Sequence, residues 1–373
     1  MMQVEAAVMY AVGEPLVVES LELEAPRAGE VLVKIGASGV CHSDYHVVSG
    51  QSGHDLPVVL GHEGAGTIVA VGDGVGELAP GDHVVLSWIP FCGECFFCTH
   101  EQTHLCKAYI GPLWAGTMTD GSNRLSKDGQ PVRQLSMLAT WADHAVVPAV
   151  SCVKIAPSIP FEVGALLGCA VTTGVGAVLN RAKVEPGSSV AIIGAGGVGL
   201  SLIMGARFAM AGRIIVFDVS LEKQALAIEM GATDFVVSSD NSIETVRDMT
   251  DGLGADYVFE AVGLVPLQEM ALEMVRPGGQ VVFVGMAGND ECMSLSAASI
   301  TRDEKLVSGS MFGSARTDRD FNLYADSYEQ GLLPVDQLVT RRYGLSDINE
   351  AIDAMLGGMP GRGVIVFDAG DDA

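Results

Sequence analysis

Basic side chains are scarce in this 373-residue chain. Lysine and arginine together number 21 against 46 aspartates and glutamates, so the formal net charge is −25, and only seven residues are lysines. A surface with this average charge repels phosphate backbones and anionic lipid headgroups. Binding to nucleic acid or to a membrane surface is therefore disfavoured, although a local basic patch remains compatible with the total.

The N-terminus lacks the basic region and apolar stretch of a secretory signal. Uncharged runs occur at 163–180 and 186–206, but both are rich in glycine, and the second contains a tight glycine turn. Neither is predicted to span a membrane. We expect a cytoplasmic protein. In that reducing compartment, clustered cysteines are more often metal ligands than disulfides.

Length and a 49% hydrophobic content predict two folded domains and exclude disorder. Up to about residue 155 the pattern is β-rich, with short apolar segments between glycines and prolines. These predicted strands are 30–35, 66–71, 82–86 and 143–147. Two stretches are predicted to be loops from their composition, 89–108 and 113–132.

From residue 163 onward, predicted strands and helices alternate. The strands are placed at 190–194, 213–218, 235–238, 257–261 and 280–285, with helices starting near 198, 221, 242 and 266. This rhythm is typical of an α/β fold with a doubly wound parallel sheet. A helix at 346–355 and a strand at 363–368 follow. We therefore expect a dinucleotide-binding domain at 163–336 and a β-rich domain at 1–162 and 337–373.

A glycine turn follows the first of these parallel strands, at Gly194, Gly196, Gly197, Val198 and Gly199. In such a motif the first glycine allows a tight turn, the second allows a pyrophosphate to approach the backbone, and the last allows close packing of helix on strand. The helix N-terminus favours the phosphates. The alternative, in so glycine-rich a chain, is a simple glycine turn.

The second parallel strand ends in Asp218, 19 residues beyond Gly199. A carboxylate near this spacing accepts hydrogen bonds from the adenosine ribose and repels a 2′-phosphate, so NAD is favoured over NADP. Lys223 is a further candidate for contact with the ribose. Its alternative interpretation is a solvated charge on a helix.

Four cysteines lie within one loop, at Cys92, Cys95, Cys98 and Cys106. Four thiolates so close together favour a closed tetrahedral Zn²⁺ site with a structural role, because no coordination position stays open. The alternatives are accidental clustering and ligation of an iron–sulfur cluster.

A second candidate set is dispersed: Cys41, His62 and Cys169. Two cysteines and one histidine with an open fourth position are the ligands of the catalytic zinc of alcohol dehydrogenases. Taken singly, Cys169 is more often a small core residue, and His62 beside a glycine-rich turn is more often structural. Their presence together with the cysteine loop and the nucleotide turn favours a metal site.

The sequence resembles the zinc-dependent alcohol dehydrogenases of the medium-chain dehydrogenase/reductase superfamily over essentially its whole length. The matching features are segments 61–66, 92–106, 259–263 and 361–362, Cys169 and the nucleotide turn. The resemblance implies a Rossmann-type domain joined to a GroES-like catalytic domain. It also implies two zinc ions per chain and hydride transfer between a primary or secondary alcohol or aldehyde and NAD(H) through a zinc-bound alkoxide.

Several residue roles are implied by this resemblance. Cys41, His62 and Cys169 correspond to the ligands of the catalytic zinc, and the four loop cysteines to those of the structural zinc. Asp44 corresponds to the acid that holds the ligating histidine. Glu63 matches a carboxylate near the zinc. Ser43, the nicotinamide ribose and His46 match a proton relay to the surface. His42 and Arg362 match residues facing the cofactor pyrophosphate.

Substrate and assembly follow from the resemblance only in part. Trp88 corresponds to an aromatic residue that lines the inner pocket; a tryptophan packed under the loop is the alternative. Ser52 and Ile110 stand where relatives that oxidise the glutathione adduct of formaldehyde carry an acid and an arginine, so that adduct is disfavoured. The segment 116–126 resembles the dimeric class and nicotinoprotein-like dehydrogenases, so we expect a homodimer, with segment 304–311 pairing across the dyad.

Three other interpretations compete with this one. A nicotinoprotein would retain its NAD. A zinc-binding nucleic-acid or regulatory module would not need the nucleotide turn, and a charge of −25 opposes it. A non-catalytic zinc- and nucleotide-binding protein is hard to reconcile with Ser43 and His46 beside the candidate ligands. Cys152 and Cys292 are assigned to no site.

Overall fold

The computed structural model describes residues 1–288 and 290–367. Within these residues the chain divides into two compact units. The first contains Met1–Cys169, Arg316–Glu329 and the described residues from Val339 on, and the second contains Ala170–Ala315 and Gln330–Leu338. Asp368, the last residue of the predicted C-terminal strand, lies outside the described residues, as does the rest of the tail.

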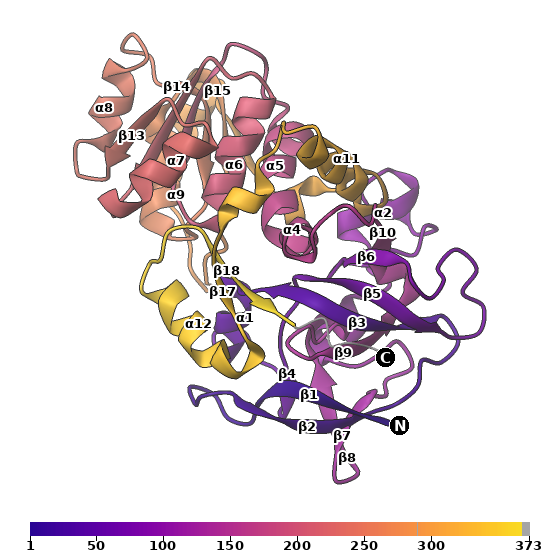
Figure 1. The fold of residues 1–373 in the computed structure, drawn as a ribbon. Coiled ribbons are helices and arrows are strands. Elements are labelled where there is room, and N and C mark those ends of the chain that lie inside the picture. Colours follow the sequence, from indigo (N-terminus) through magenta and orange to yellow (C-terminus); the bar gives the residue numbers. More distant parts are fainter. Residues whose placement is uncertain (289, 368–373) are drawn as a thin grey trace. The chain divides into compact units, whose positions relative to one another are not determined.

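The first unit contains two β structures (Figure 1). Strands β1, β2, β7, β8 and β4 form a closed barrel. A second sheet has the order β10, β6, β5, β3, β18, β17, with β9 paired to β3. The strands are β1 (Met2–Met9), β2 (Val17–Leu23), β3 (Glu30–Gly39), β4 (Val58–Val59), β5 (Gly64–Val71), β6 (His83–Leu86), β7 (Leu125–Lys127), β8 (Gln130–Gln134), β9 (His144–Pro148), β10 (Cys152–Lys154), β17 (Val339–Tyr343) and β18 (Arg362–Val366).

Strand β3 organises this sheet because it pairs with β5 on one side and with β9 and β18 on the other. Val31, Val33 and Ile35 are fully buried and pack with Ile68 of β5 and Ala145 of β9. The predicted strands 30–35, 66–71, 82–86 and 143–147 are confirmed. Strand β3 ends at Gly39, two residues before Cys41, the first candidate ligand in the chain.

The second unit contains a parallel sheet, part of which is labelled in Figure 1. Its strand order is β13, β12, β11, β14, β15, β16. In chain order this is 3-2-1-4-5-6, the doubly wound arrangement of dinucleotide-binding folds, so the predicted fold class is confirmed. Its strands are β11 (Ser189–Ile193), β12 (Arg213–Asp218), β13 (Asp234–Val237), β14 (Ala255–Glu260), β15 (Val275–Phe283) and β16 (Leu306–Gly309). Val190, Ile192 and Val258 are fully buried, as expected for strands covered by helices on both faces.

The α-helices are α1 (His42–Val48), α2 (Phe96–Thr99), α3 (Ile110–Ala115), α4 (Phe161–Leu166), α5 (Thr172–Gly176), α6 (Gly197–Phe208), α7 (Gln224–Met230), α8 (Ser242–Asp248), α9 (Val265–Met274), α10 (Ala297–Arg302), α11 (Thr317–Glu329) and α12 (Ile348–Leu356). The π-helical turn Leu167–Val171 joins α4 to α5, and a second π-helical turn, Ala177–Ala182, follows α5, so that residues 161–182 form one helical stretch.

That stretch, Phe161–Ala182, is the one helix of the described residues long and apolar enough to cross a membrane. However, 83% of its most apolar window is buried inside the structure. Its hydropathy is therefore accounted for by burial among protein side chains. The other uncharged run, 186–206, is divided between strand β11 and helix α6, as its glycine turn predicts.

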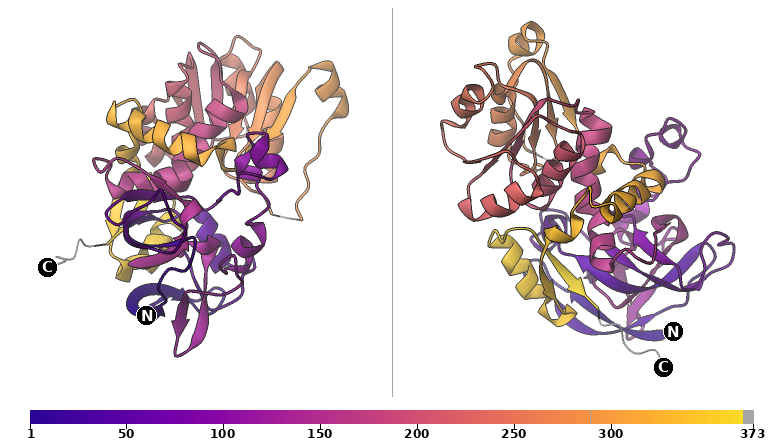
Figure 2. Two further views of the ribbon diagram at one scale, coloured as in Figure 1. Left: turned by 90° about the vertical axis from the view of Figure 1, so that its right-hand side faces the viewer. Right: turned by 45° about the horizontal axis from the view of Figure 1, so that its top comes forward.

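The prediction of loops at 113–132 and 89–108 was wrong in part. The first stretch includes the end of α3 and most of a hairpin, which Figures 1 and 2 show projecting from the barrel. Lys127 pairs with Gln130, so Asp128 and Gly129 form a two-residue turn, with φ values of 50° and 75°. Asp-Gly is a strong hairpin signal, but the polar composition around it concealed the short strands. The second stretch contains α2 and a 3₁₀ turn at Thr103–Leu105.

A buried ion pair fastens the segment before this hairpin to β3. Arg124 is 1% exposed, and its Nε and Nη2 donate to the two carboxylate oxygens of Glu30 at 2.8 and 2.5 Å. Nη2 also contacts Asp120 at 3.1 Å. A bidentate pair of this kind is geometrically specific, so it fixes the position of Arg124 against Glu30 of β3.

Replacing Arg124 with alanine should leave the buried Glu30 carboxylate without its positively charged partner, with only the backbone N–H of Arg27 still donating to it, at 3.0 Å. Removing one member of a buried pair costs about 3–5 kcal/mol, so we expect the melting temperature to fall by several degrees. The matched control is Arg27→Ala, because Arg27 also contacts Asp120, at 2.8 Å, but its side chain is 47% exposed. The control should change little; equal shifts in the two variants would contradict this assignment.

Candidate active site

The first candidate ligand stands at the N-terminal end of α1. Cys41 caps this helix in an extended conformation, with φ −117° and ψ 149°. Asp44 is fully buried, whereas His42 and Ser43 are exposed. One turn of helix thus directs Asp44 into the protein and leaves the hydroxyl of Ser43 accessible.

The second candidate ligand, His62, is held by Asp44. The Oδ1 atom of Asp44 accepts hydrogen bonds from the Gly61 backbone N–H and from Nδ1 of His62, both at 3.0 Å. With its proton on Nδ1, the imidazole offers the lone pair of Nε2 to a metal. Gly61 has φ +90°, and a Cβ there would lie 2.6 Å from the backbone nitrogen of Trp141, so the turn requires glycine.

The third candidate ligand comes from a distant part of the chain. Cys169 lies in the middle of the π-helical turn η4 (Leu167–Val171). One ligating atom each from Cys41, His62, Glu63 and Cys169 all lie within 4.8 Å of one another. Two sulfurs, one imidazole nitrogen and a neighbouring carboxylate suit zinc in both chemistry and spacing.

Glu63 is fully buried, and its Oε2 accepts a hydrogen bond from Nη2 of Arg362 at 2.5 Å. The same guanidinium nitrogen donates to the backbone carbonyl of Val40 at 2.9 Å. Oε1 of Glu63 is buried and has no hydrogen-bond partner among the described residues. Burial raises the pKa of Glu63 to about 7, although Arg362 opposes the shift. A second positive charge near Oε1 would therefore stabilise the ionised form of the Glu63 carboxylate.

The ligand side chains influence one another's protonation. Hydrogen bonding from Cys169 lowers the pKa of the Cys41 thiol well below its ordinary value, and the same contact raises the pKa of Cys169. Burial opposes protonation of His62, but Asp44 and Cys41 outweigh it and raise its pKa. Metal binding must therefore displace protons from this cluster.

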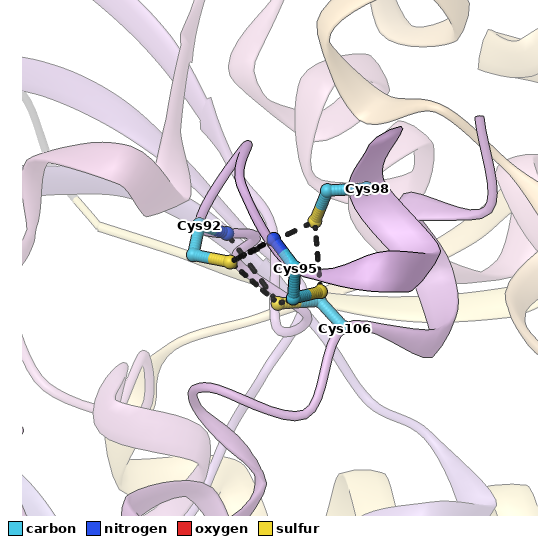
Figure 3. A group of neighbouring side chains, drawn as sticks. All are labelled: Cys92, Cys95, Cys98 and Cys106. Atoms are coloured by element: carbon cyan, nitrogen blue, oxygen red, sulfur yellow. Dashed lines mark hydrogen bonds between the residues drawn. The ribbon is translucent and has the colours of Figure 1, made fainter. Parts of the chain in front are cut away.

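The four loop cysteines converge on one point (Figure 3). The sulfur-to-sulfur distances are 3.5 Å for Cys95–Cys98, 3.6 Å for Cys92–Cys106, and 3.9 Å for Cys92–Cys98 and Cys95–Cys106. Four sulfurs each about 2.3 Å from a shared zinc ion would be about 3.8 Å apart in a tetrahedron. The backbone N–H groups of Cys92 and Cys95 donate to sulfurs at 3.4 Å, which favours thiolates.

The nucleotide turn lies in the second unit and has the geometry expected of its glycines. Gly194 has φ +98°, and a Cβ at Gly199 would lie 1.9 Å from the carbonyl oxygen of Gly194. A Cβ at Gly196 would meet no atom within 4 Å. Helix α6 begins at Gly197, and Val198 lies in its first turn.

Asp218 is buried at the end of β12 and closes this turn. Its Oδ2 accepts from the backbone N–H of Ala195 at 2.7 Å and from Nζ of Lys223 at 3.1 Å, while Oδ1 accepts from the N–H of Ser220 at 2.9 Å. The side chain of Lys223 is only 15% exposed. Lys223 is therefore an ion-pair partner of Asp218 rather than a solvated helix charge.

Three further predicted residues, His42, His46 and Trp88, lie near the candidate ligands Cys41 and His62. The ring centroids of His42 and His46 are 6.0 Å apart on α1, and burial, followed by His42, lowers the pKa of His46. The Trp88 ring lies 6.1 Å from that of His62 in an edge-to-face arrangement. Trp88 also packs against a small apolar cluster of Leu113, Met118 and Met137.

Sequence reasoning missed the glycines that make room for the ligands. A Cβ at Gly39 would lie 2.0 Å from Oε2 of Glu63, so the buried carboxylate needs this glycine. Gly168 plays a similar part next to Cys169. Neither belongs to a motif, and their partners lie 24 and more residues away in the sequence, so no local signal marks them.

Comparison with known proteins gives two family matches. Residues 27–157 match the alcohol dehydrogenase GroES-like domain, and residues 197–328 match the zinc-binding dehydrogenase family. S-(hydroxymethyl)glutathione dehydrogenase of Synechocystis is 41% identical over 370 residues, which are 98% of this chain and 100% of that protein. The Escherichia coli enzyme of the same name is 40% identical over 375 residues, with the same two coverages.

Two solved structures resemble this chain over nearly its full length. A zinc-binding-domain alcohol dehydrogenase protein from Burkholderia ambifaria has a TM-score of 0.94 and 33% identity, covering 98% of this chain and 99% of its own. Benzyl alcohol dehydrogenase from Acinetobacter calcoaceticus has a TM-score of 0.93 and 30% identity, covering 99% of this chain and 100% of its own.

The fold and the two cysteine-containing sites thus define a zinc-binding dehydrogenase with a GroES-like domain. The chain belongs to the zinc-dependent alcohol dehydrogenases of the medium-chain dehydrogenase/reductase superfamily. It is an oxidoreductase that interconverts alcohols and aldehydes with NAD(H), and zinc and NAD are its cofactors.

Replacing Asp44 with asparagine should weaken zinc binding by about 10–100-fold, the usual effect of losing the partner that orients a ligating histidine. Zinc retention against a competing chelator measures this effect. Asp143→Asn is the matched control, because Asp143 contacts Nδ1 of His144 at 3.1 Å in a pair outside the ligand cluster. Unchanged zinc retention in Asp44→Asn, or an equal loss in the control, would contradict the assignment.

Proposed function

We propose that Cys41, His62 and Cys169 hold the catalytic zinc, and that Cys92, Cys95, Cys98 and Cys106 hold a structural zinc. The observation that carries this proposal is the convergence of three donors from separate elements, with the acid Asp44 fixing the tautomer of the histidine. A cysteine-only site leaves no open position, whereas two cysteines and one histidine do.

Zinc held there supplies a Lewis acid that polarises the alcohol or aldehyde oxygen. The surrounding residues prepare the site for it. Asp44 keeps the proton of His62 on Nδ1, so Nε2 faces the ligand cluster. Arg362 holds one oxygen of Glu63 and leaves the other buried and unpartnered, so the carboxylate is available to the zinc.

The alcohol proton needs a route out. We assign its acceptance to the Ser43 hydroxyl and its delivery to solvent to His46, which is three residues further along α1 and half-buried. Residues three apart on a helix lie on one face. Because burial lowers the pKa of His46, the ring is neutral near pH 7 and able to accept a proton.

NAD binding belongs to the second unit in this proposal. The turn Gly194–Gly199 and the N-terminus of α6 receive the pyrophosphate, and Asp218, with Lys223 at its side, receives the adenosine ribose. His42 and Arg362 offset the repulsion between a dianionic cofactor and a protein of net charge −25. We propose a nucleotide domain at 163–336 and a catalytic domain at 1–162 and 337–373. The compact units of the structure have different bounds, since residues 163–169 and Arg316–Glu329 belong to the first unit.

For the substrate, we propose a compact alcohol or aldehyde with an apolar body. Trp88 stands beside His62, and the apolar cluster of Leu113, Met118 and Met137 packs behind it. Ser52 and Ile110 offer no charge to a glutathione moiety, which argues against the adduct named in the Synechocystis and Escherichia coli enzymes. An aromatic alcohol, as named for the Acinetobacter enzyme, suits the site better.

We also propose a cytoplasmic homodimer. None of the eight cysteines, all within the described residues, forms a disulfide, as suits a reducing compartment. Strand β16 (Leu306–Gly309) lies at the edge of the parallel sheet, and Leu306 is 59% exposed. An exposed strand edge can pair with its copy across a dyad.

The purified protein should contain two zinc ions per chain and should reduce NAD⁺ when benzyl alcohol is added, as read from the absorbance of NADH. One zinc ion without reduction would overturn the proposal. Activity only with an artificial electron acceptor, with NAD retained through purification, would identify a nicotinoprotein instead.

In the same assay kcat/KM should be lower for S-(hydroxymethyl)glutathione than for benzyl alcohol, and the reverse order would refute the proposed substrate class.

Ser43→Ala should lower turnover by orders of magnitude while the zinc content stays at two per chain, because the variant removes a proton acceptor and no ligand. Ser49→Ala is the matched control. Ser49 is the C-cap residue of α1, and its hydroxyl donates to the backbone carbonyl of His46 at 3.3 Å. Unchanged turnover in Ser43→Ala would remove this residue from the mechanism.

A further inference from the structure

The helical stretch Phe161–Ala182 changes its winding where it passes the metal site. Helix α4 ends at Leu166, the π-helical turn η4 (Leu167–Val171) follows, and α5 begins at Thr172. π-helical turns are rare, and they occur frequently at functional sites. Cys169 is the central residue of this turn, and its sulfur belongs to the ligand cluster.

Each side of the turn is fastened by close packing within its own unit. A Cβ at Gly164 of α4 would lie 2.9 Å from the Cβ of Ala65 on β5. A Cβ at Gly174 of α5 would lie 2.4 Å from the Cβ of Ser201 on α6. A rotation of α4 about its axis that would redirect Cys169 would therefore disrupt the close contact between Gly164 and Ala65.

The extra residue of a π-turn changes the direction in which the side chains of the turn point. Hydrogen bonds in a π-turn join residues five apart instead of four, and each residue of an α-helix turns the chain by about 100°. One additional residue after α4 therefore changes the direction of the side chains in the turn by a large angle, while the packing of α4 on β5 is kept.

Gly168 allows the turn to lie close to strand β6 and to Glu63. A Cβ at this position would lie 3.0 Å from the carbonyl oxygen of Leu86 and 3.7 Å from the Cα of Glu63. The carbonyl belongs to the last residue of β6, so it cannot swing away as a flexible side chain would. Glycine thus allows the backbone next to Cys169 to lie directly against the residue that follows His62.

We propose that the π-helical turn η4, with Gly168 as its contact residue, is the device that positions Cys169 as a metal ligand. The proposal rests on the proposed function, because it takes Cys169 to be a ligand of the catalytic zinc. In this role Gly168 and Ala170 are positioning residues: they act on zinc binding through Cys169 alone.

Deletion of Ala170 tests the proposal, because it removes the additional residue of the turn. The matched control is deletion of Leu179 from the second π-helical turn, η5 (Ala177–Ala182), which contains no histidine, cysteine, aspartate or glutamate. Zinc per chain is measured after dialysis against a chelator. Exposed thiols are identified by alkylation with iodoacetamide and peptide mass spectrometry, a readout that does not depend on activity.

We expect the Ala170 deletion to keep one zinc ion per chain, with Cys41 and Cys169 alkylated and Cys92, Cys95, Cys98 and Cys106 protected. The Leu179 deletion should keep two zinc ions. Two zinc ions and a protected Cys169 in the Ala170 deletion would overturn the proposal. Loss of the same zinc from both deletions would overturn it as well, since any damage to the helix would then have the same effect.

Two substitutions complete the test. Cys169→Ala should bind one zinc ion; if it binds two, the ligand assignment itself fails, and the proposed function fails with it. If the Ala170 deletion does not fold, Gly168→Ala decides the question. This variant should weaken zinc binding at the site of Cys41, His62 and Cys169 by about tenfold, without affecting the four-cysteine site. Unchanged zinc affinity in this variant would overturn the role of the turn.

Discussion

The structure depends on burying several ionisable groups in one place without leaving their charge unbalanced. Cys41, Cys169, His62 and Glu63 meet within 4.8 Å of one another, and Arg362 is the buried cation beside them. Unpaired charge is costly inside a protein. In the proposed assignment, a divalent metal ion held by the thiolates and the imidazole would offset that cost and would supply a Lewis acid for the substrate oxygen. The residues that would destabilise the site without metal are then the ones that make it catalytic.

The rest of the first unit holds these groups in position. Strand β3 leads to Cys41, the turn at Gly61 orients His62 through Asp44, and the π-helical turn brings in Cys169. At each of these places a glycine allows an approach that a Cβ would block. The four-cysteine site is different, because its ligands all come from one loop and need no distant element to meet.

This difference explains which features could be predicted from the sequence. The four-cysteine site was recognisable from spacing alone, and the parallel sheet from the rhythm of apolar strands. The dispersed ligands at 41, 62 and 169 carry no spacing signal, so they were assigned through family resemblance. The β7–β8 hairpin was missed because polar residues surround Asp128 and Gly129. The roles of Gly39 and Gly168 and the π-helical turn were not predictable, because their causes are contacts with residues remote in the sequence.

The central claim is that zinc occupies the buried cluster of Cys41, His62 and Cys169. The most direct measurement is an anomalous difference map from a crystal of the purified protein, with data collected on both sides of the zinc absorption edge. The account predicts two peaks per chain, one among these three residues and one among the four loop cysteines. A single peak at the loop cysteines, with none at the buried cluster of an active preparation, would contradict it.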